Sequence, residues 1–287
     1  MPKVLYVSMP FAAPSWGSLG LGTLKAIGQQ AGIASDIQYL NIPFAVAIGE
    51  AHYNALREKV EAELCFTTAL RPEVDARELW RQCVGRGGEG SDGTSEALKE
   101  AEQGFLRIAT EHVPRFLDSA MARIPWDDYD IVGFTTGYHQ LTASLALAER
   151  IRGRFPEMII LFGGAGCDGV MGPALLRHFD VIDVVVSGEA DSLIVPLVQA
   201  LRKRSPVDRL PRVHARASSR VAVSSSPQRS AMTGGPPPWP WMSCRCPTTR
   251  TSSRSMRTPA SRRKHGSPSS PRAAAGGDRS TCAPSAG

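Results

Sequence analysis

The sequence predicts an α/β protein built on an open, doubly wound sheet of mainly parallel strands. Short apolar, β-branched segments alternate along the chain with segments whose apolar residues follow helical spacing. Several of the strand segments run directly into glycine-rich loops, as buried strands do when they carry a loop to a ligand. This alternation is typical of β-α-β units with parallel strands and right-handed crossovers.

The first β-α-β unit lies at the N-terminus. Residues 3–8 (KVLYVS) predict a buried strand, and residues 36–40 (DIQYL) predict a second strand. Between them, residues 15–31 carry apolar side chains at helical spacing, and Gly32 follows as a helix-ending residue. Residues 44–122 then interrupt the alternation and predict a helical insertion. Its expected helices cover residues 53–64, 76–84 and 98–120, with a kink near Pro114 and a flexible loop over 85–95.

The alternation resumes after the insertion and brings the number of expected strands to five. Strands are predicted over residues 130–135, 158–162 and 182–186, and helices over 141–154, 173–179 and 192–204. The expected fold is therefore a five-stranded, Rossmann-like sheet over residues 1–210. In such sheets, ligands bind outside the carboxyl ends of the strands.

The charge of the chain is divided unevenly. Residues 212–287 contain 13 of the 33 Lys and Arg residues but only one of the 27 acidic residues, so the net charge of +6 belongs to this tail. No stretch is apolar enough to cross a membrane, the N-terminus lacks the shape of a signal peptide, and the six cysteines are too scattered for a disulfide scaffold. The sequence thus predicts a soluble cytoplasmic protein.

Three of the expected strands end in glycine-containing loops: GFTTGYHQ (133–140), FGGAGCDG (162–169) and SGEAD (187–191). Glycines let a backbone approach a flat or bulky ligand, although each loop alone could be only a tight turn. Three such loops on one edge favour a ligand site. The second loop is not a dinucleotide fingerprint, because it follows the fourth strand and no acidic residue follows at the required spacing.

These segments resemble the cobalamin-binding domain of cobalamin-dependent radical S-adenosylmethionine enzymes. The resemblance rests on residues 3–33, GFTT (133–136), ILFGG (160–164) and DVVVSGEAD (183–191), and it covers roughly residues 3–210. The stretch YLNIPFAVAIGEAHY (39–53) is similar to the branch that C-methylates ribosomally made precursor peptides. The resemblance implies cobalamin as cofactor and a precursor peptide as substrate of the intact family member.

The resemblance also implies where the nucleotide tail of the corrinoid lies: between the loops at Thr135–Thr136 and Gly163–Gly164, with the loop Ser187–Glu189 beside it. The implied cofactor-binding residues are Gly20, Thr135, Thr136, Gly163, Gly164, Ala165, Gly166, Ser187, Gly188 and Glu189. Gly17, Gly20 and Gly22 would bring the first helix close to the ligand. Packing of that helix on the sheet explains the same three glycines equally well.

No metal ligand is predicted. The DxHxxG sequence, whose histidine ligates cobalt in many cobalamin proteins, is absent, and we expect His139 to be a polar loop residue and Cys167 a small buried one. The intact family holds an iron–sulfur cluster with CxxxCxxC and cleaves S-adenosylmethionine there. This chain offers only Cys244, Cys246 and Cys282 after the loops. We therefore expect neither the cluster nor S-adenosylmethionine cleavage in this chain.

The tail after residue 210 contains no Leu, Ile, Phe or Tyr and predicts a disordered segment. Its excess of Arg, Pro and Ala is also what a GC-rich gene gives when read out of frame. For example, codons for MSCRCPTTRTSSR (242–254) can be chosen that read DVLPVPDYDDFFE in the shifted frame, an acidic linker. The favoured interpretation is a cobalamin domain truncated by a frame change. The alternative is a stand-alone module for a corrinoid or nucleotide-like ligand, with a basic tail for nucleic acid.

Overall fold

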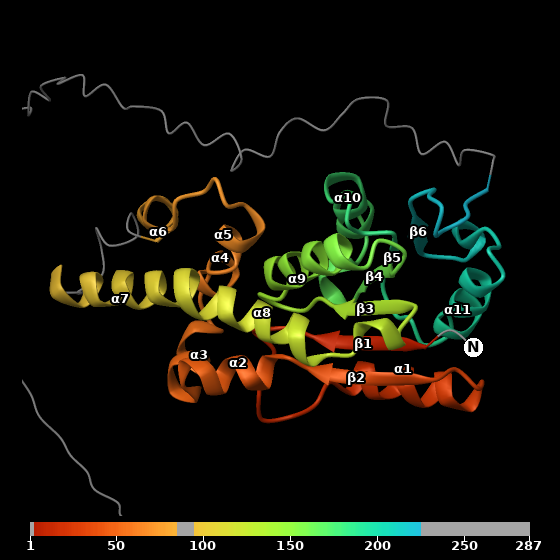
Figure 1. The fold of residues 1–287 in the computed structure, drawn as a ribbon, viewed down its shortest axis with the longest axis horizontal. Coiled ribbons are helices and arrows are strands. Elements are labelled where there is room, and N and C mark those ends of the chain that lie inside the picture. The colour runs from red at the N-terminus through yellow and green to blue at the C-terminus, as the bar shows by residue number, and fades with distance from the viewer. Residues whose placement is uncertain (1–2, 85–94, 225–287) are drawn as a thin grey trace, which may run out of the picture. The chain divides into compact units, whose positions relative to one another are not determined.

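Six strands form one sheet in the part of the chain that the computed structural model describes, residues 3–84 and 95–224. Their spatial order is β2-β1-β3-β4-β5-β6, and all are parallel except β6, which pairs with β5 in the antiparallel direction (Figure 1). The strands are β1 (Val4–Ser8), β2 (Ser35–Tyr39), β3 (Ile131–Thr135), β4 (Ile159–Gly163), β5 (Val184–Val186) and β6 (Val213–Ala215). The expected doubly wound α/β fold is confirmed, although the expected number of five strands is wrong because β6 adds a sixth among the described residues.

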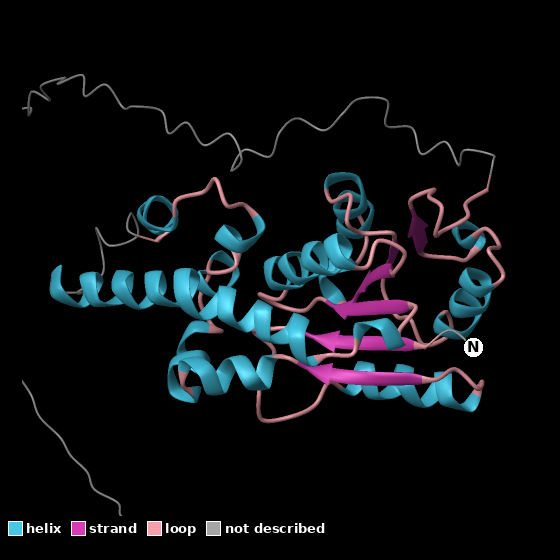
Figure 2. Ribbon diagram, viewed as in Figure 1, coloured by secondary structure: helices cyan, strands magenta, loops and turns pink. Residues whose placement is uncertain are grey.

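Four helices connect successive strands, as the alternation predicts (Figure 2). They are α1 (Leu19–Gln30), α9 (Leu141–Arg154), α10 (Met171–His178) and α11 (Ile194–Arg202). The first of them begins at Leu19 and not at residue 15, because the Ser18 hydroxyl oxygen accepts a hydrogen bond from the backbone N–H of Leu21 at 3.3 Å. A serine in this position ends the preceding loop and caps the helix.

The two faces of the sheet bury different cores. One face, with Val4, Tyr6 and Leu161, packs against α1 and α11. The other face carries the alternate residues of the same strands, such as Leu5 and Phe134, and packs against α9, α10 and the helices of the insertion. Because neighbouring residues of a strand point to opposite faces, each central strand is buried on both sides. That explains its continuous apolar sequence.

The order of the strands defines where a ligand site is expected. Strand β1 continues into α1 on one face, whereas β3 continues into α9 on the other face. The two connections therefore leave the sheet in opposite directions between β1 and β3. Such a switch point opens a crevice at the carboxyl ends of the strands.

Helices fill the chain between β2 and β3, so the helical insertion is confirmed. They are α2 (Asn41–Ile48), α3 (Glu50–Leu56), α4 (Glu61–Leu64), α5 (Thr67–Leu70), α6 (Ala76–Cys83), α7 (Ser95–Arg107) and α8 (Val113–Arg123). The single helix expected over residues 53–64 is wrong, because α3 ends at Leu56 and α4 starts at Glu61. A π-helical turn, Ile108–His112, joins α7 to α8 directly before Pro114, which has no backbone N–H for a regular helix. Residues 85–94 of the expected loop lie outside the described residues.

The insertion fixes the loop between β1 and α1. The hydroxyl of Tyr53 donates a hydrogen bond to the carbonyl oxygen of Ala12 at 2.6 Å, and the Asn41 amide donates one to Ala13 at 3.1 Å. From the other side, the amide of Gln140 donates to the carbonyl oxygen of Met9 at 2.7 Å. The backbone that leaves β1 is therefore held at several points along its length.

The sheet extends past residue 210, where the sequence predicts the folded part to end. Strand β6 covers residues 213–215, and Val213 and Val221 are buried beside it. A three-residue strand in a segment rich in Arg and Ser carries too little periodicity to be predicted. The folded part thus reaches at least residue 224, while the rest of the predicted tail lies outside the described residues.

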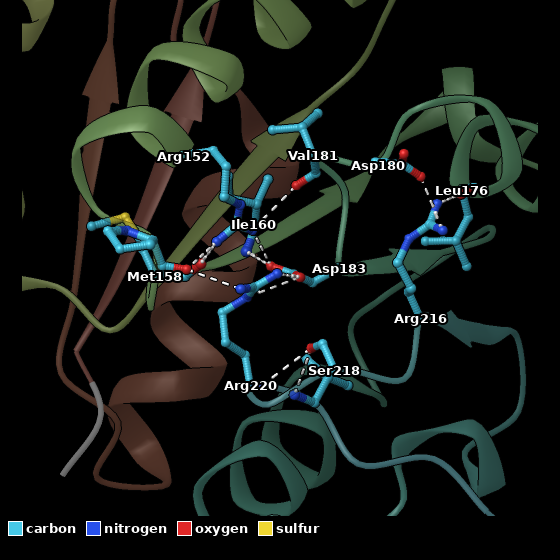
Figure 3. A network of polar contacts seen from close by, with 12 residues as sticks. Arg152, Met158, Ile160, Leu176, Asp180, Val181, Asp183, Arg216, Ser218 and Arg220 are labelled. Carbon is cyan, nitrogen blue, oxygen red and sulfur yellow. Dashed lines mark hydrogen bonds and ion pairs between the residues drawn. The ribbon is translucent and has the colours of Figure 1, made fainter.

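A buried carboxylate ties this C-terminal extension to the sheet (Figure 3). Asp183, which is fully buried, accepts a hydrogen bond from the backbone N–H of Ile160 at 2.9 Å. Its carboxylate pairs with Arg152 of α9 and with Arg220, whose Nη2 lies 2.8 Å from Oδ1. Arg216 reaches the carbonyl oxygen of Leu176. Two elements that are far apart in the sequence therefore converge on one aspartate.

Candidate binding groove at the carboxyl edge of the sheet

Hydrogen bonds join the loops after β3 and β4 to each other. The backbone N–H of Thr136 donates to the carbonyl oxygen of Gly163 at 2.7 Å, and the N–H of Gly166 donates to the carbonyl oxygen of Thr136 at 2.8 Å. Gly164 lies between these contacts with φ of +93°, a conformation that favours glycine. A Cβ atom there would stand 2.9 Å from the Thr136 carbonyl oxygen. The glycines at this position therefore allow two loops to pack backbone against backbone.

A narrow groove of about 120 Å³ opens beside these loops, between α1 and α11. It lies on the face of the sheet that these two helices cover, at the carboxyl ends of β1, β3, β4 and β5. Its lining is mostly apolar, with carboxylates only at Glu189 and Asp191 and without Lys or Arg. The volume is below the ~300–1,000 Å³ of a site that encloses a whole drug-sized ligand. The groove could therefore receive only a narrow part of a larger molecule.

The floor of the groove follows from the register of the strands. Tyr6 lies opposite Gly133, and Gly133 lies opposite Leu161, so the three residues form one row across β1, β3 and β4. A Cβ atom on Gly133 would stand 3.3 Å from Cδ1 of Tyr6. The glycine thus makes room for the tyrosine ring. Tyr6 and Gly133 both line the groove, but neither is among the ten site residues expected from the sequence.

The hydroxyl group of Tyr6 is an unusual feature of this floor. The residue is 2% exposed, and its hydroxyl oxygen is buried without a hydrogen-bond partner. Burial raises the pKa of Tyr6 to about 12, so the hydroxyl stays protonated at neutral pH. A residue that lines the groove therefore carries a buried polar group without a hydrogen-bond partner.

The structure gathers six of the ten predicted site residues along this groove. They are Gly20, Thr135, Gly163, Gly164, Gly188 and Glu189. The other four do not line it. Thr136 and Ser187 are buried and donate hydrogen bonds to the carbonyl oxygens of Gly163 and Cys167, respectively. Ala165 and Gly166 belong to a 3-10 turn behind the loop.

The three glycines near the start of α1 differ from one another. Gly17 lies beside Tyr39, whose hydroxyl oxygen would stand 3.0 Å from a Cβ atom. Gly20 lines the groove, and a Cβ atom there would meet only Ser18 Oγ, at 3.9 Å. A Cβ atom added to Gly22 would meet no other atom within 4 Å, and Gly22 does not line the groove. Close packing on the sheet therefore explains neither Gly20 nor Gly22.

His139 and Cys167 both lie outside the lining of the groove. The side chain of His139 is 10% exposed, and its Nδ1 is 3.9 Å from the carboxylate of Glu63. Cys167 is fully buried, and burial raises the pKa of its thiol, while a 3.4 Å contact with the Thr136 hydroxyl opposes this shift. Within residues 3–84 and 95–224, no three His, Cys, Asp or Glu side chains are grouped as a metal site.

Exposed apolar side chains lie on the segments that follow the strands at the same edge of the sheet as the groove. We call five of them the apolar rim: Trp16, Leu19, Tyr138, Val170 and Met171. They follow β1, β3 and β4, whose carboxyl ends share one edge of the sheet. Leu19 and Val170 are each 85% exposed, which is unusual for aliphatic side chains. Apolar surface gathered around a groove is typical of a binding site.

A larger hollow, of about 740 Å³, lies at the opposite edge of the sheet. It is lined by residues that precede or start β3 and β4, among them Tyr129 and Met158, and by several arginines. One of these, Arg220, is already paired with the buried Asp183. Ligand sites of open α/β sheets lie at the carboxyl ends, so the smaller groove is the better candidate.

The fold and the groove define an open α/β protein with a flavodoxin-like strand order and a candidate ligand site at its switch point. No family model and no curated protein matches the chain. Among solved structures, "XylFII molecule" is similar at 10% identity and a TM-score of 0.21, over 75% of this chain and 99% of that one. A crystal structure from Mycobacterium smegmatis is similar at 10% identity and a TM-score of 0.19, over 75% and 91% of the two chains. No described helix is both long and apolar enough to cross a membrane.

Proposed function

We propose that the folded part of this chain binds cobalamin, as the cofactor domain of a radical S-adenosylmethionine enzyme that C-methylates a ribosomally made peptide. The observation that carries the proposal is the groove at the β1/β3 switch point, which is too narrow for a whole ligand and opens at the edge of the sheet that carries the apolar rim. A corrinoid has a matching shape, because a broad macrocycle carries a narrow nucleotide tail. The tail would enter the groove, and the macrocycle would lie over the rim.

The residues of the groove fit this tail by shape. Gly20 and Gly163 line it without side chains, so that a flat ring could approach the backbone at both positions. Leu21, Leu161 and Leu197 supply apolar contact in the same lining. A ligand held in this way loses apolar surface to the protein, which stabilises the complex in proportion to the area buried.

The charges of the groove favour a corrinoid over a dinucleotide. Glu189 and Asp191 line it, and no Lys or Arg does. Carboxylates repel the clustered phosphates of a dinucleotide more strongly than the single phosphodiester of a corrinoid tail. The lining also contains no His, Cys or Met. A protein side chain would therefore not ligate the cobalt from within the groove.

When bound, cobalamin supplies a carrier for the methyl group. The residues of this chain would position it, and the loops joined at Thr136 and Gly166 would hold the groove open before the ligand arrives. The cluster that starts the radical reaction requires three closely spaced cysteines, and the sequence has no CxxxCxxC. We therefore propose binding without cleavage of S-adenosylmethionine for the 287-residue chain.

A matched pair of variants on α1 tests the proposal. The protein is reconstituted with hydroxocobalamin and desalted, and the corrinoid absorbance that stays with the protein is measured. Gly20→Leu fills the groove and should abolish retention, whereas Gly22→Leu makes the same change away from the groove and should retain the ligand. Loss in both variants, or in neither, would contradict this placement. Absence of retention by the unmodified protein would contradict cobalamin binding itself.

A further inference from the structure

Tyr6 is the only one of three buried tyrosines in the described residues whose hydroxyl makes no hydrogen bond. The hydroxyl of Tyr53 donates to the carbonyl oxygen of Ala12 at 2.6 Å, and that of Tyr129 donates to the carboxylate of Asp36 at 3.0 Å. The hydroxyl of Tyr6 is buried without a partner. Leaving such a group unsatisfied costs stability. A phenylalanine would fill the same space beside Gly133 without that cost.

The position of Tyr6 limits what could reach it. It lies two residues before the end of β1, so its row is about 7 Å below the edge of the sheet. Gly163 and Thr135 lie at that edge, where β3 and β4 end. A group that contacts the Tyr6 hydroxyl must therefore pass between the two helices and enter the groove beyond the edge. Only a flat, narrow part of a ligand fits this path.

Tyr6 is suited to act as a hydrogen-bond donor at this depth. A protonated phenol offers one O–H and can also accept. No carboxylate or amide side chain of the described residues takes up that O–H. Gly133 and Leu161, its neighbours in the row, present no polar side chain. The missing partner is therefore a hydrogen-bond acceptor that enters with the ligand.

We propose that the Tyr6 hydroxyl determines specificity for the lower base of the corrinoid, by donating a hydrogen bond to a ring nitrogen of that base. This rests on the proposed function, since it names the part of the ligand that lies deepest in the groove. The base is the flat end of the nucleotide tail, and its ring nitrogen is free to accept when it does not bind cobalt. The lining of the groove would thus select corrinoids with a nitrogen-containing base.

The experiment compares two ligands and three proteins. The ligands are cobalamin and cobinamide, which has the same macrocycle but lacks the nucleotide tail. The proteins are the unmodified chain, Tyr6→Phe and Tyr129→Phe. The last variant loses the same atom from a tyrosine that precedes β3, outside the groove. Dissociation constants are measured from the change in corrinoid absorbance, and unfolding midpoints are measured in parallel.

We expect Tyr6→Phe to weaken cobalamin binding about tenfold, which corresponds to one hydrogen bond, and to leave cobinamide binding unchanged. Tyr129→Phe should change neither constant. The unfolding midpoint of Tyr6→Phe should not fall, because its hydroxyl stabilises nothing in the free protein.

The alternative outcomes separate the two proposals. Equal cobalamin affinity of Tyr6→Phe and the unmodified chain would overturn the role of Tyr6 and leave the proposed function standing. If Tyr6→Phe weakens the binding of cobalamin and cobinamide equally, the proposed hydrogen bond from Tyr6 to the lower base is wrong. If the unmodified chain binds neither ligand, the proposed function itself fails.

Discussion

The backbone of Gly164 lies directly against the backbone of Thr136. A Cβ atom added to Gly164 would stand 2.9 Å from the Thr136 carbonyl oxygen and 3.1 Å from its nitrogen. Its neighbour Gly163 differs, because a Cβ atom there would meet only the carbonyl oxygen of Val186, at 3.8 Å. Two adjacent glycines therefore have different roles. Gly164 joins two loops, whereas Gly163 leaves space in the groove.

This difference predicts opposite results for the two positions. Gly163→Val should keep the unfolding midpoint close to that of the unmodified chain and should lose retained cobalamin, because the side chain enters the groove. Gly164→Ala should lower the midpoint, since its positive φ and the contact with Thr136 both strain the loop. Thermal unfolding and corrinoid retention after desalting measure the two effects. Loss of stability in Gly163→Val as large as in Gly164→Ala would contradict this division.

Tyr6→Phe should stabilise the free protein by about 1 kcal/mol at neutral pH, because an unsatisfied buried hydroxyl is removed. The gain should grow in alkali. Burial raises the pKa of Tyr6 to about 12 from its usual 10, so the folded state resists loss of that proton. Because the unfolded chain loses this proton near pH 10 and the folded chain only near pH 12, the unmodified protein loses roughly 3 kcal/mol of stability across this range, whereas Tyr6→Phe does not.

Urea unfolding at a series of pH values measures this effect. The midpoints of the unmodified chain and of Tyr6→Phe should diverge as the pH rises above 10. Parallel curves for the two proteins would show that Tyr6 does not titrate in this range.

Asp183→Asn should lower the free energy of unfolding by about 3 kcal/mol, because Arg152 and Arg220 then lose the charge of their shared buried partner. The matched control is Asp180→Asn in the same connection between α10 and β5. That carboxylate is 93% exposed where it pairs with Arg216, and its loss should leave the urea midpoint unchanged. Equal effects of the two substitutions would contradict a structural role for the buried pair.

Removal of the C-terminal segment should have an effect that depends sharply on where the chain ends. A chain ending at residue 224 keeps β6, Arg220 and Val221, and we expect its unfolding midpoint to match that of the full chain. A chain ending at residue 210 loses all three and exposes the edge of β5, so it should unfold at a clearly lower denaturant concentration. Equal midpoints for the two truncated chains would show that β6 contributes nothing.

His139→Ala should leave the absorbance and cobalt(II) paramagnetic resonance spectra of bound cobalamin unchanged. The side chain lies outside the groove and faces Glu63, so it is not placed to ligate the metal. Loss of a nitrogen-ligand signal in this variant would contradict the prediction.

The sequence predicts the order of strands and helices well, because each central strand is buried on both faces and is therefore apolar throughout. The Gly-rich loops likewise contain Gly163 and Gly188, and the family resemblance implies Gly20; all three line the groove. The role of Tyr6, and the packing of its ring on Gly133, could not be found in this way. The two residues lie opposite each other only because of the register between β1 and β3, and these strands are separated in the sequence by the whole insertion. A glycine inside a strand often marks a place where another group comes close to the backbone, so Gly133 is the one feature of the sequence that indicates this contact.

The ion pair between Asp183 and Arg220 limits where the reading frame of the gene could change. Codons read in a shifted frame have no reason to supply the partner of one particular buried aspartate. Arg220 nevertheless completes that pair, and Val221 fills the core beside it. If the reading frame changes, the change therefore lies beyond the codon of Val221. The nucleotides to resequence are therefore those that follow the codon of Val221.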